Sequence, residues 1–152
     1  MQVKCYIFDL DGTLADDSHR WHYVERSNDW DSYYAACSAD KPIEHVVAIA
    51  RSLLAAGYRL AIVTGRSEQI RRETEAWLLA QGVLYDVLIM RKRGDRRLNS
   101  ELKVSALHEL RSRGYLPLMA FDDLEPAVQA WRAAGLPCAQ VSNVAAWTVE
   151  HP

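Results

Sequence analysis

Two short groups of acidic residues have the side chains that a metal site for phosphate chemistry requires. Asp9 and Asp11 alternate in the run DLDGT at positions 9–13, and Asp122 and Asp123 are adjacent. Four carboxylates in one place would repel one another unless a cation lay among them. Such oxygen ligands favour Mg²⁺, which keeps some of its waters and accepts a substrate phosphate as a further ligand. The two groups therefore predict a magnesium site, provided that the fold brings them together.

Each acidic group follows a short apolar run that predicts a buried strand. The run 3–8 ends at Asp9, and the run 118–121 ends at Asp122. A third predicted strand, 58–63, is followed by Thr64, Gly65 and Arg66. The carboxyl ends of parallel strands meet at one edge of a sheet, where ligands of open α/β sheets bind. We therefore expect these polar residues to share one site.

The rest of the chain predicts the sheet that this site requires. Two more strands are expected at 85–90 and 138–141, the latter at an edge. Helices are predicted to begin near Pro42, Ser67, Ser100 and Pro126, and to end near Gly57, Gly82, Arg113 and Gly135. Alternating strands and helices predict a parallel sheet flanked by helices. We expect one Rossmann-like α/β domain over 1–152, with only a short cap insertion at about 15–41, where no clean period is visible.

Length and composition narrow the class of protein. The chain has 152 residues and a formal net charge of −2, values that suit one globular domain without general affinity for nucleic acid. No apolar run is long enough for a membrane helix, and the first residues lack the features of a signal peptide. Three widely spaced cysteines, Cys5, Cys37 and Cys138, predict buried thiols rather than a disulfide framework. We expect a cytoplasmic protein with no membrane association, and the sequence implies no obligate protein partner.

The motifs resemble those of the haloacid dehalogenase (HAD) superfamily. The run DLDGT matches the DxDGT signature of that superfamily, and Thr64, Lys103 and the pair Asp122-Asp123 follow in the order of its remaining motifs. The DxDGT string alone is a weak signal, but the preceding strand and the three later motifs supply its structural context. The resemblance extends over about 3–135.

The resemblance implies a role for each of these residues. Asp9 is the expected nucleophile, which attacks phosphorus to form an aspartyl-phosphate. Asp11 is expected to protonate the leaving oxygen and then to activate water. Lys103 would neutralise charge on Asp9 and on the phosphoryl oxygens. The expected metal ligands are Asp9 and Asp122, the backbone carbonyl of Asp11, and Asp123 directly or through water. The expected phosphate ligands are Thr64 and the amide of Gly65.

The second acid of the motif favours phosphate chemistry. Superfamily members that cleave carbon–halogen bonds lack a residue like Asp11, and ion-pumping members usually carry threonine there. Phosphomutases keep it but generally need a sizeable cap domain. The stretches 14–41 and 66–102 are too short to hold such a cap, so the site should be open to a bulky substrate. Phosphatase is therefore the favoured reaction.

A closer resemblance is to the 3′-phosphatase domain of phage-type polynucleotide kinases. The shared residues, in chain order, are Arg20, Asp40-Lys41-Pro42, Thr64-Gly65-Arg66, Arg91, Gly94-Asp95-Arg96, Lys103, Asp122-Asp123 and Trp131-Arg132. It implies that Arg20, Arg66 and Arg91 bind substrate, and we expect them to do so at an open rim where replacement changes stability little. Asn99 stands where that family usually has an acid, and we expect it to orient Lys103 by a hydrogen bond. No P-loop motif for a kinase occurs in the sequence.

Two further features allow both functional and structural interpretations. The basic run over 91–97 fits contact with a nucleic-acid backbone, or it is a solvated loop. Aromatic residues in the insertion could stack a base or could pack the cap onto the core: Trp21, Tyr23, Trp30, Tyr33 and Tyr34. His19 and His22 lack the further ligands of a zinc site.

Three functions remain open from the sequence. The leading one is hydrolysis of 3′-phosphates on nucleic-acid ends or 3′-nucleotides, with Mg²⁺ as cofactor. An alternative is a phosphatase for a small metabolite, such as a nucleoside 5′-monophosphate or a sugar phosphate. A non-catalytic module that binds phosphorylated ends is the third, and it is disfavoured by the intact Asp9, Asp11 and Lys103.

Overall fold

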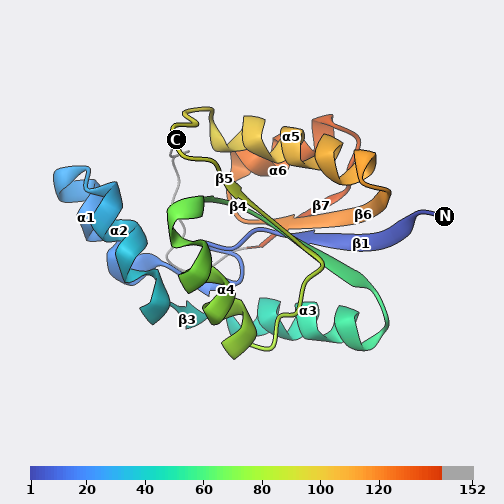
Figure 1. Ribbon diagram of the computed structural model, residues 1–152, viewed down its shortest axis with the longest axis horizontal. Coiled ribbons are helices and arrows are strands. Elements are labelled where there is room, and N and C mark those ends of the chain that lie inside the picture. The colour runs from blue at the N-terminus through green and yellow to red at the C-terminus, as the bar shows by residue number, and fades with distance from the viewer. Residues whose placement is uncertain (142–152) are drawn as a thin grey trace.

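The computed structural model confirms the parallel sheet with helices on both faces (Figure 1). It describes residues 1–141. The strands, in the spatial order β5-β4-β1-β6-β7, are Val87–Arg91, Arg59–Ser67, Val3–Phe8, Tyr115–Asp122 and Cys138–Gln140. One face is covered by α3 (Glu44–Ala55) and α4 (Arg71–Ala80), and the other by α5 (Asn99–Ser112) and α6 (Glu125–Ala133).

Two strands are longer than the sequence indicates. β4 continues through the polar residues 64–67, and a 3₁₀ turn, Glu68–Ile70, comes before α4. β6 begins three residues earlier than predicted and includes Pro117, which has no backbone N–H for the ladder. A register shift solves this problem: Cys5 pairs with Pro117 and Tyr6 with Met119, so Leu118 is the extra residue of a bulge.

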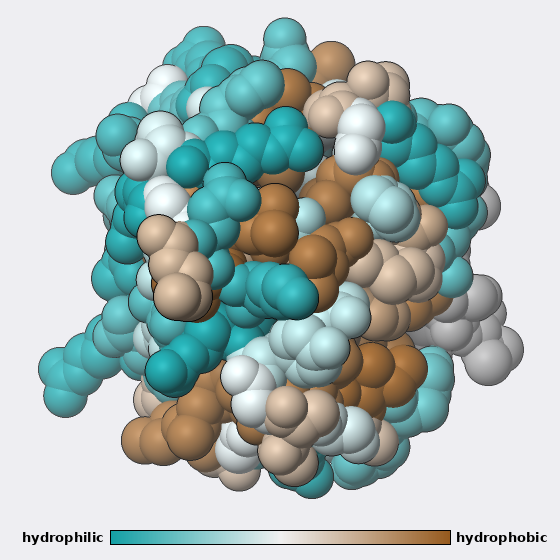
Figure 2. All heavy atoms as spheres, turned by 90° about the vertical axis from the view of Figure 1, so that its right-hand side faces the viewer, coloured by the Kyte–Doolittle hydropathy of each residue, from teal (hydrophilic) through white to brown (hydrophobic). Residues whose placement is uncertain are grey.

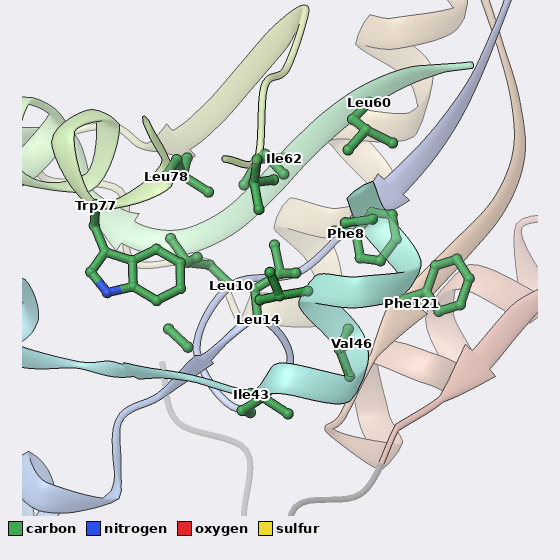
Figure 3. Close-up of a cluster of buried hydrophobic side chains, with 14 of the residues drawn as sticks. Phe8, Leu10, Leu14, Ile43, Val46, Leu60, Ile62, Trp77, Leu78 and Phe121 are labelled. Atoms are coloured by element: carbon green, nitrogen blue, oxygen red, sulfur yellow. The ribbon is translucent and has the colours of Figure 1, made fainter. Parts of the chain in front are cut away.

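Two hydrophobic clusters hold the sheet between its helices. The cluster beneath α3 and α4 packs Phe8 and Phe121 from neighbouring strands in a stacked pair, with ring centroids 4.5 Å apart. Leu10 and Leu14, which flank the acidic motif, enter the same cluster beside Ile43 (Figure 3). The cluster beneath α5 and α6 contains Leu107, Leu110 and Trp131, among others. The three cysteines are buried and free, as predicted.

The insertion forms a small helical cap at one end of the sheet. β2 (Ala15–Asp16) and β3 (Lys41–Pro42) pair antiparallel and close it at its base. Between them lie α1 (Trp21–Ser27) and α2 (Trp30–Ala35), with 3₁₀ turns at Ser18–Arg20 and Ala36–Ala39. The helices have only seven and six residues, too few for a helical period to be visible in the sequence.

The cap lies at the carboxyl end of the parallel strands. In Figure 1, β1 enters from the N-terminus on the right and points toward α1 and α2 on the left. Figure 2 shows the opposite end, where hydrophobic residues are interspersed with hydrophilic ones. The residues that follow β1, β4 and β6 therefore meet beneath the cap. No helix among residues 1–141 combines the length and the apolar character that crossing a membrane requires.

Candidate active site

Three acidic residues from two neighbouring strands converge at this end of the sheet. Asp9, Asp122 and Asp123 each offer a carboxylate oxygen, and these oxygens lie within 4.8 Å of one another. All three side chains are buried or nearly so, and Asp9 is 6% exposed. Parallel pairing of β1 with β6 produces this convergence, because Phe8 and Phe121 are register partners one residue before the acids.

The motif loop separates its apolar residues from its polar ones. The Leu10 carbonyl accepts hydrogen bonds from the amides of Thr13, Leu14 and Ala15, which closes a tight turn. Leu10 and Leu14 point into the core, whereas Asp9 lines the site. Gly12 has φ +80°, and a Cβ atom there would lie 2.1 Å from Asp123 Oδ2. Glycine is therefore required both by the backbone conformation and by the close approach of Asp123.

Lys103 places one ammonium group among these carboxylates. Its Nζ lies 2.7 Å from Asp9 Oδ1 and 3.1 Å from Asp122 Oδ2, and it donates to the Val63 carbonyl at 2.8 Å. An ammonium has three donors, so these partners satisfy it completely. The Trp131 indole N–H donates to Asp122 Oδ2 at 3.0 Å. The lysine is thus fixed beside both the predicted nucleophile and a predicted metal ligand.

The charges of this group match the expected cation. The group holds three carboxylates and one ammonium, and the ammonium contacts only Asp9 and Asp122, so negative charge is left unbalanced. Burial, followed by repulsion from Asp122, raises the pKa of Asp9 to about 6 even though Lys103 lowers it. Burial together with Asp9 and Asp122 raises the pKa of Asp123 well above its usual value. A hard divalent cation would relieve this repulsion, and all the donors are oxygens, so the residues fit Mg²⁺.

The strand end at Thr64 presents backbone and hydroxyl groups to the same site. Pairing of β4 with β5 is regular up to Val63 and resumes at Ser67, and the residues between them are displaced from the ladder. Thr64 and Gly65 line the pocket, and the Thr64 hydroxyl accepts a hydrogen bond from the Arg66 amide at 3.1 Å. A bulge of this kind turns backbone groups away from the sheet. The predicted phosphate ligands therefore line the same pocket as Asp9 and Asp123.

The Asp11 side chain points away from the metal group and toward two arginines. Arg66 donates through Nε and a terminal nitrogen to Asp11 Oδ1, at 3.0 and 2.7 Å, and Arg20 donates to the same oxygen at 2.7 Å. Burial would raise the pKa of Asp11, but Arg66 and Arg20 outweigh it and hold the value at about 2. Asp11 is therefore ionised at neutral pH in this arrangement.

A second carboxylate, Asp40, joins the two arginines from the opposite side. Arg20 donates to both of its oxygens at 2.8 and 2.7 Å, and Arg66 donates to Oδ2 at 2.8 Å. The backbone carbonyl of Asp40 accepts the Trp77 indole N–H. The sequence places Asp40 in a shared stretch, but it does not show that this residue neutralises both arginines. That relation depends on the cap closing over β4.

The expectation that all three arginines lie at an open rim is wrong. Arg20 is 0% exposed and Arg66 is 1% exposed, and Arg20 also lies over the Tyr33 ring at 4.1 Å. Only Arg66 and Arg91 line the pocket. Arg91 is half-buried and donates to the carbonyls of Gly65, Asp95 and Arg97. The arginines therefore have structural partners in addition to any substrate.

The expected hydrogen bond from Asn99 to Lys103 is absent. Asn99 Oδ1 is buried without a hydrogen-bond partner, and it lies where a Cβ atom on Gly65 would be 2.7 Å away. The lysine is instead held by the Val63 carbonyl. Likewise, His19 contacts Asp40 at 2.7 Å, and among the described residues neither His19 nor His22 belongs to a metal-binding group.

The site opens into a pocket between the cap and the sheet. Its volume is about 80 Å³, far below the roughly 300–1,000 Å³ of sites that enclose a drug-sized ligand. One wall carries Asp9, Asp11, Asp17 and Asp123, and the cap contributes Trp30, Tyr33 and Tyr34. Asp17 is a pocket residue that the sequence analysis missed. Burial, followed by Asp11, raises its pKa to about 7, and it accepts a 2.5 Å hydrogen bond from the Tyr33 hydroxyl.

Comparison with known proteins gives a consistent result. The sequence model of the family described as the polynucleotide kinase PNKP phosphatase domain matches residues 3–145. Among solved structures, a chain of the Pnkp1/Rnl/Hen1 complex is 27% identical and superposes with a TM-score of 0.78. A chain of the Pnkp1/Rnl/Hen1 RNA repair complex has the same identity and TM-score. These matches cover 92% of this chain but 46% and 42% of those chains, so it spans less than half of their length.

A more distant structure shares the fold. The class C acid phosphatase from Bacillus anthracis, with tungstate bound, has a TM-score of 0.70 at 14% identity. The match covers 95% of this chain and 68% of that one.

Proposed function

Because the chain belongs to the family of polynucleotide kinase PNKP phosphatase domains, which are phosphatases of the HAD superfamily, we propose that it removes 3′-phosphates from nucleic-acid ends or 3′-nucleotides. The observation that carries the proposal is the pocket around Asp9. The small volume suits a terminal phosphate, while the rest of a long substrate stays outside. A nucleic-acid end is a substrate of that shape.

Asp9 is the proposed nucleophile. One of its oxygens is held by Lys103 and the other by the Thr13 hydroxyl at 3.0 Å, so the carboxylate is fixed in orientation. In the first step an Asp9 oxygen forms a bond to phosphorus, and the bond from phosphorus to the substrate 3′-oxygen breaks. In the second step water attacks the aspartyl-phosphate, which releases inorganic phosphate and regenerates Asp9. Lys103 neutralises charge on the reacting oxygens in both steps.

Asp11 is the proposed acid and base, and the arginines explain how its proton affinity changes. With a pKa of about 2, it holds no proton at neutral pH while Arg20 and Arg66 both contact it. An entering phosphate dianion competes for the Arg66 guanidinium and repels the Asp11 carboxylate, and both effects raise its pKa. Asp11 then carries the proton that the leaving 3′-oxygen needs, and it later removes one from the attacking water.

The side chains of Asp9, Asp122 and Asp123, with the backbone carbonyl of Asp11, would hold Mg²⁺. When bound, the ion supplies positive charge that balances the buried carboxylates and a substrate phosphate. Thr64 and the Gly65 amide bind phosphoryl oxygens, and Arg66 and Arg91 stand on the same pocket. Lys92, Arg93 and Arg96 are exposed beyond Arg91, where a nucleic-acid backbone would leave the site. The likeness to a chain of an RNA repair complex supports such a substrate.

A substrate panel tests the proposal. The substrates are an oligonucleotide with a 3′-phosphate, the same oligonucleotide with a 5′-phosphate, a 3′-mononucleotide and a 5′-mononucleotide, each with Mg²⁺. We expect the 3′-phosphates to be hydrolysed at least tenfold more efficiently than the 5′-phosphates, and we expect Asp9→Asn to lower the activity more than a thousandfold. Preference for the 5′-mononucleotide would favour a small-metabolite phosphatase instead. Binding of the 3′-phosphate without release of inorganic phosphate would favour a non-catalytic module.

A further inference from the structure

Two aromatic residues of the cap, Trp30 and Tyr34, line the pocket and are partly exposed. Tyr33 is buried and bonded to Asp17, and neither Trp21 nor Tyr23 lines the pocket. Trp30 lines the pocket with Asp9 and Thr64 and remains partly exposed. Trp30 and Tyr34 therefore both have the position of a ligand-binding side chain beside the phosphate site, and Trp30 has the larger ring.

The Trp30 ring is held in place by its neighbours. Its indole N–H donates to Asn28 Oδ1 at 3.0 Å, and its ring meets Tyr33 edge to face, with centroids 5.5 Å apart and planes at 80°. Asn28 ends α1 in the left-handed conformation, with φ 51°, and Asp29 caps α2 by accepting from the Ser32 amide. A side chain fixed in this way loses little conformational entropy when a ligand packs on it.

The cap itself is joined to the catalytic end of the sheet. Arg20 donates to the Tyr33 carbonyl at 3.1 Å, and the Tyr34 hydroxyl donates to the Gly65 carbonyl at 3.4 Å. Tyr34 also lines the pocket and lies against Trp30, with centroids 6.0 Å apart. These contacts join the aromatic side of the pocket, Trp30 and Tyr34, to Gly65, one of the residues proposed to bind phosphate.

We infer that Trp30, supported by Tyr34, stacks the base of the 3′-terminal nucleotide while its phosphate occupies the pocket. This inference rests on the proposed function and names how the same site recognises its substrate. Trp30 lines the same pocket as Asp9 and Thr64 and is partly exposed, so the base next to a bound 3′-phosphate can pack on its ring. Stacking on an indole accepts every base because each has a π face, which suits an enzyme that meets ends of any sequence.

The experiment compares two oligonucleotides of the same sequence, both with a 3′-phosphate. One ends in an ordinary nucleotide and the other in an abasic residue, so that they differ only in the base that Trp30 would contact. Loss of one stacked base should lower kcat/KM of the wild-type protein roughly 5- to 150-fold. Trp30→Ala should reduce this ratio to about one, and Trp30→Phe should keep part of it.

Trp21→Ala is the matched control, because it removes the same side chain from the same cap outside the pocket. It should keep the wild-type ratio, and thermal unfolding should show that each variant is folded. Equal efficiencies of the wild-type protein on the two oligonucleotides, or a full ratio in Trp30→Ala, would overturn the inference while leaving 3′-phosphatase activity intact. Hydrolysis of a 5′-phosphate with none of either 3′-phosphate would overturn the proposed function itself, and the inference with it.

Discussion

Lys103 Nζ lies 2.7 Å from Asp9 Oδ1, although the two residues are 94 positions apart in the chain. The lysine comes from the first turns of α5 and the aspartate from the end of β1. Both groups are buried, so their attraction is little screened by water. Attraction to Asp122 and Asp9 outweighs the effect of burial and raises the pKa of Lys103, so the ammonium keeps its charge. The contacts of this ion pair determine the effects that we expect from substitutions at Asp9.

Asp9→Asn should lower the turnover of any phosphomonoester more than a thousandfold, because an amide is a very poor nucleophile. The fold should survive, since Lys103 keeps its contacts with Asp122 and Val63. Release of phosphate from a 3′-phosphorylated oligonucleotide measures the loss, and mass spectrometry guards against deamidation. Substantial residual turnover in an intact Asn variant would exclude the covalent mechanism.

Mg²⁺ should be required for activity, and Ca²⁺ should suppress it, because calcium prefers more ligands and longer bonds. Mg²⁺ should also raise the midpoint of thermal unfolding, more at pH 8 than at pH 5. The sign follows from Asp9, whose pKa of about 6 in the folded protein lies above its unfolded value. Without a cation, ionisation of Asp9 destabilises the folded protein as the pH rises from about 4 to about 6. Bound Mg²⁺ would offset this loss of stability.

Differential scanning calorimetry with Mg²⁺ and with EDTA, at both pH values, measures this effect. Asp123→Asn is the control, and it should reduce the stabilisation by Mg²⁺. An unchanged rate after the metal has been stripped, or an equal midpoint with and without Mg²⁺ at pH 8, would contradict the metal assignment.

Arg20→Ala should destabilise the fold by about 3–5 kcal/mol, because it leaves buried Asp40 and partly buried Asp11 without one of their partners. Arg91→Ala should cost about 1 kcal/mol, since water can replace its bonds to half-exposed carbonyls. Urea unfolding measures both. On a 3′-phosphorylated oligonucleotide, Arg91→Ala should lower catalytic efficiency about tenfold to a hundredfold by loss of a charge-assisted hydrogen bond. An Arg20→Ala protein as stable as the wild type would refute the buried network.

Asp17→Asn should stabilise the protein above pH 7, by on the order of 2–4 kcal/mol. The pKa of Asp17 is raised to about 7 in the folded chain, so the wild-type protein loses stability as the pH rises from about 4 to 7. The asparagine oxygen can still accept from the Tyr33 hydroxyl. The difference in unfolding free energy should be smallest at low pH and should grow toward pH 8, measured in EDTA. A difference independent of pH would show that the Asp17 carboxyl is not responsible.

Much of the fold and of the site was predictable from the sequence. Apolar runs of strand length, each ending in polar residues, predicted the sheet and the edge at which Asp9, Thr64 and Asp122 meet. This works because the direction of parallel strands is set by the chain itself, so residues after the strands share one edge whatever the details of packing. The burial of the three cysteines was predicted from their small number and wide spacing. The short cap was predicted from the length of the insertion, and its two helices were too short to leave a period.

Tertiary structure alone decided which side chains contact one another. Arginine is a residue type that commonly binds phosphate at a protein surface, but closure of the cap buries Arg20 and Arg66 between Asp11 and Asp40. The same closure brings Asp17 and Trp30 to the pocket. Packing of α5 against the sheet leaves the Asn99 side-chain oxygen without the predicted bond to Lys103. The burial of a side chain and its ion pairs depend on neighbours that are distant in sequence. The pKa values of these residues depend on the same neighbours. Periodicity and spacing contain local information only, and these relations therefore appear when the cap and the sheet are packed together.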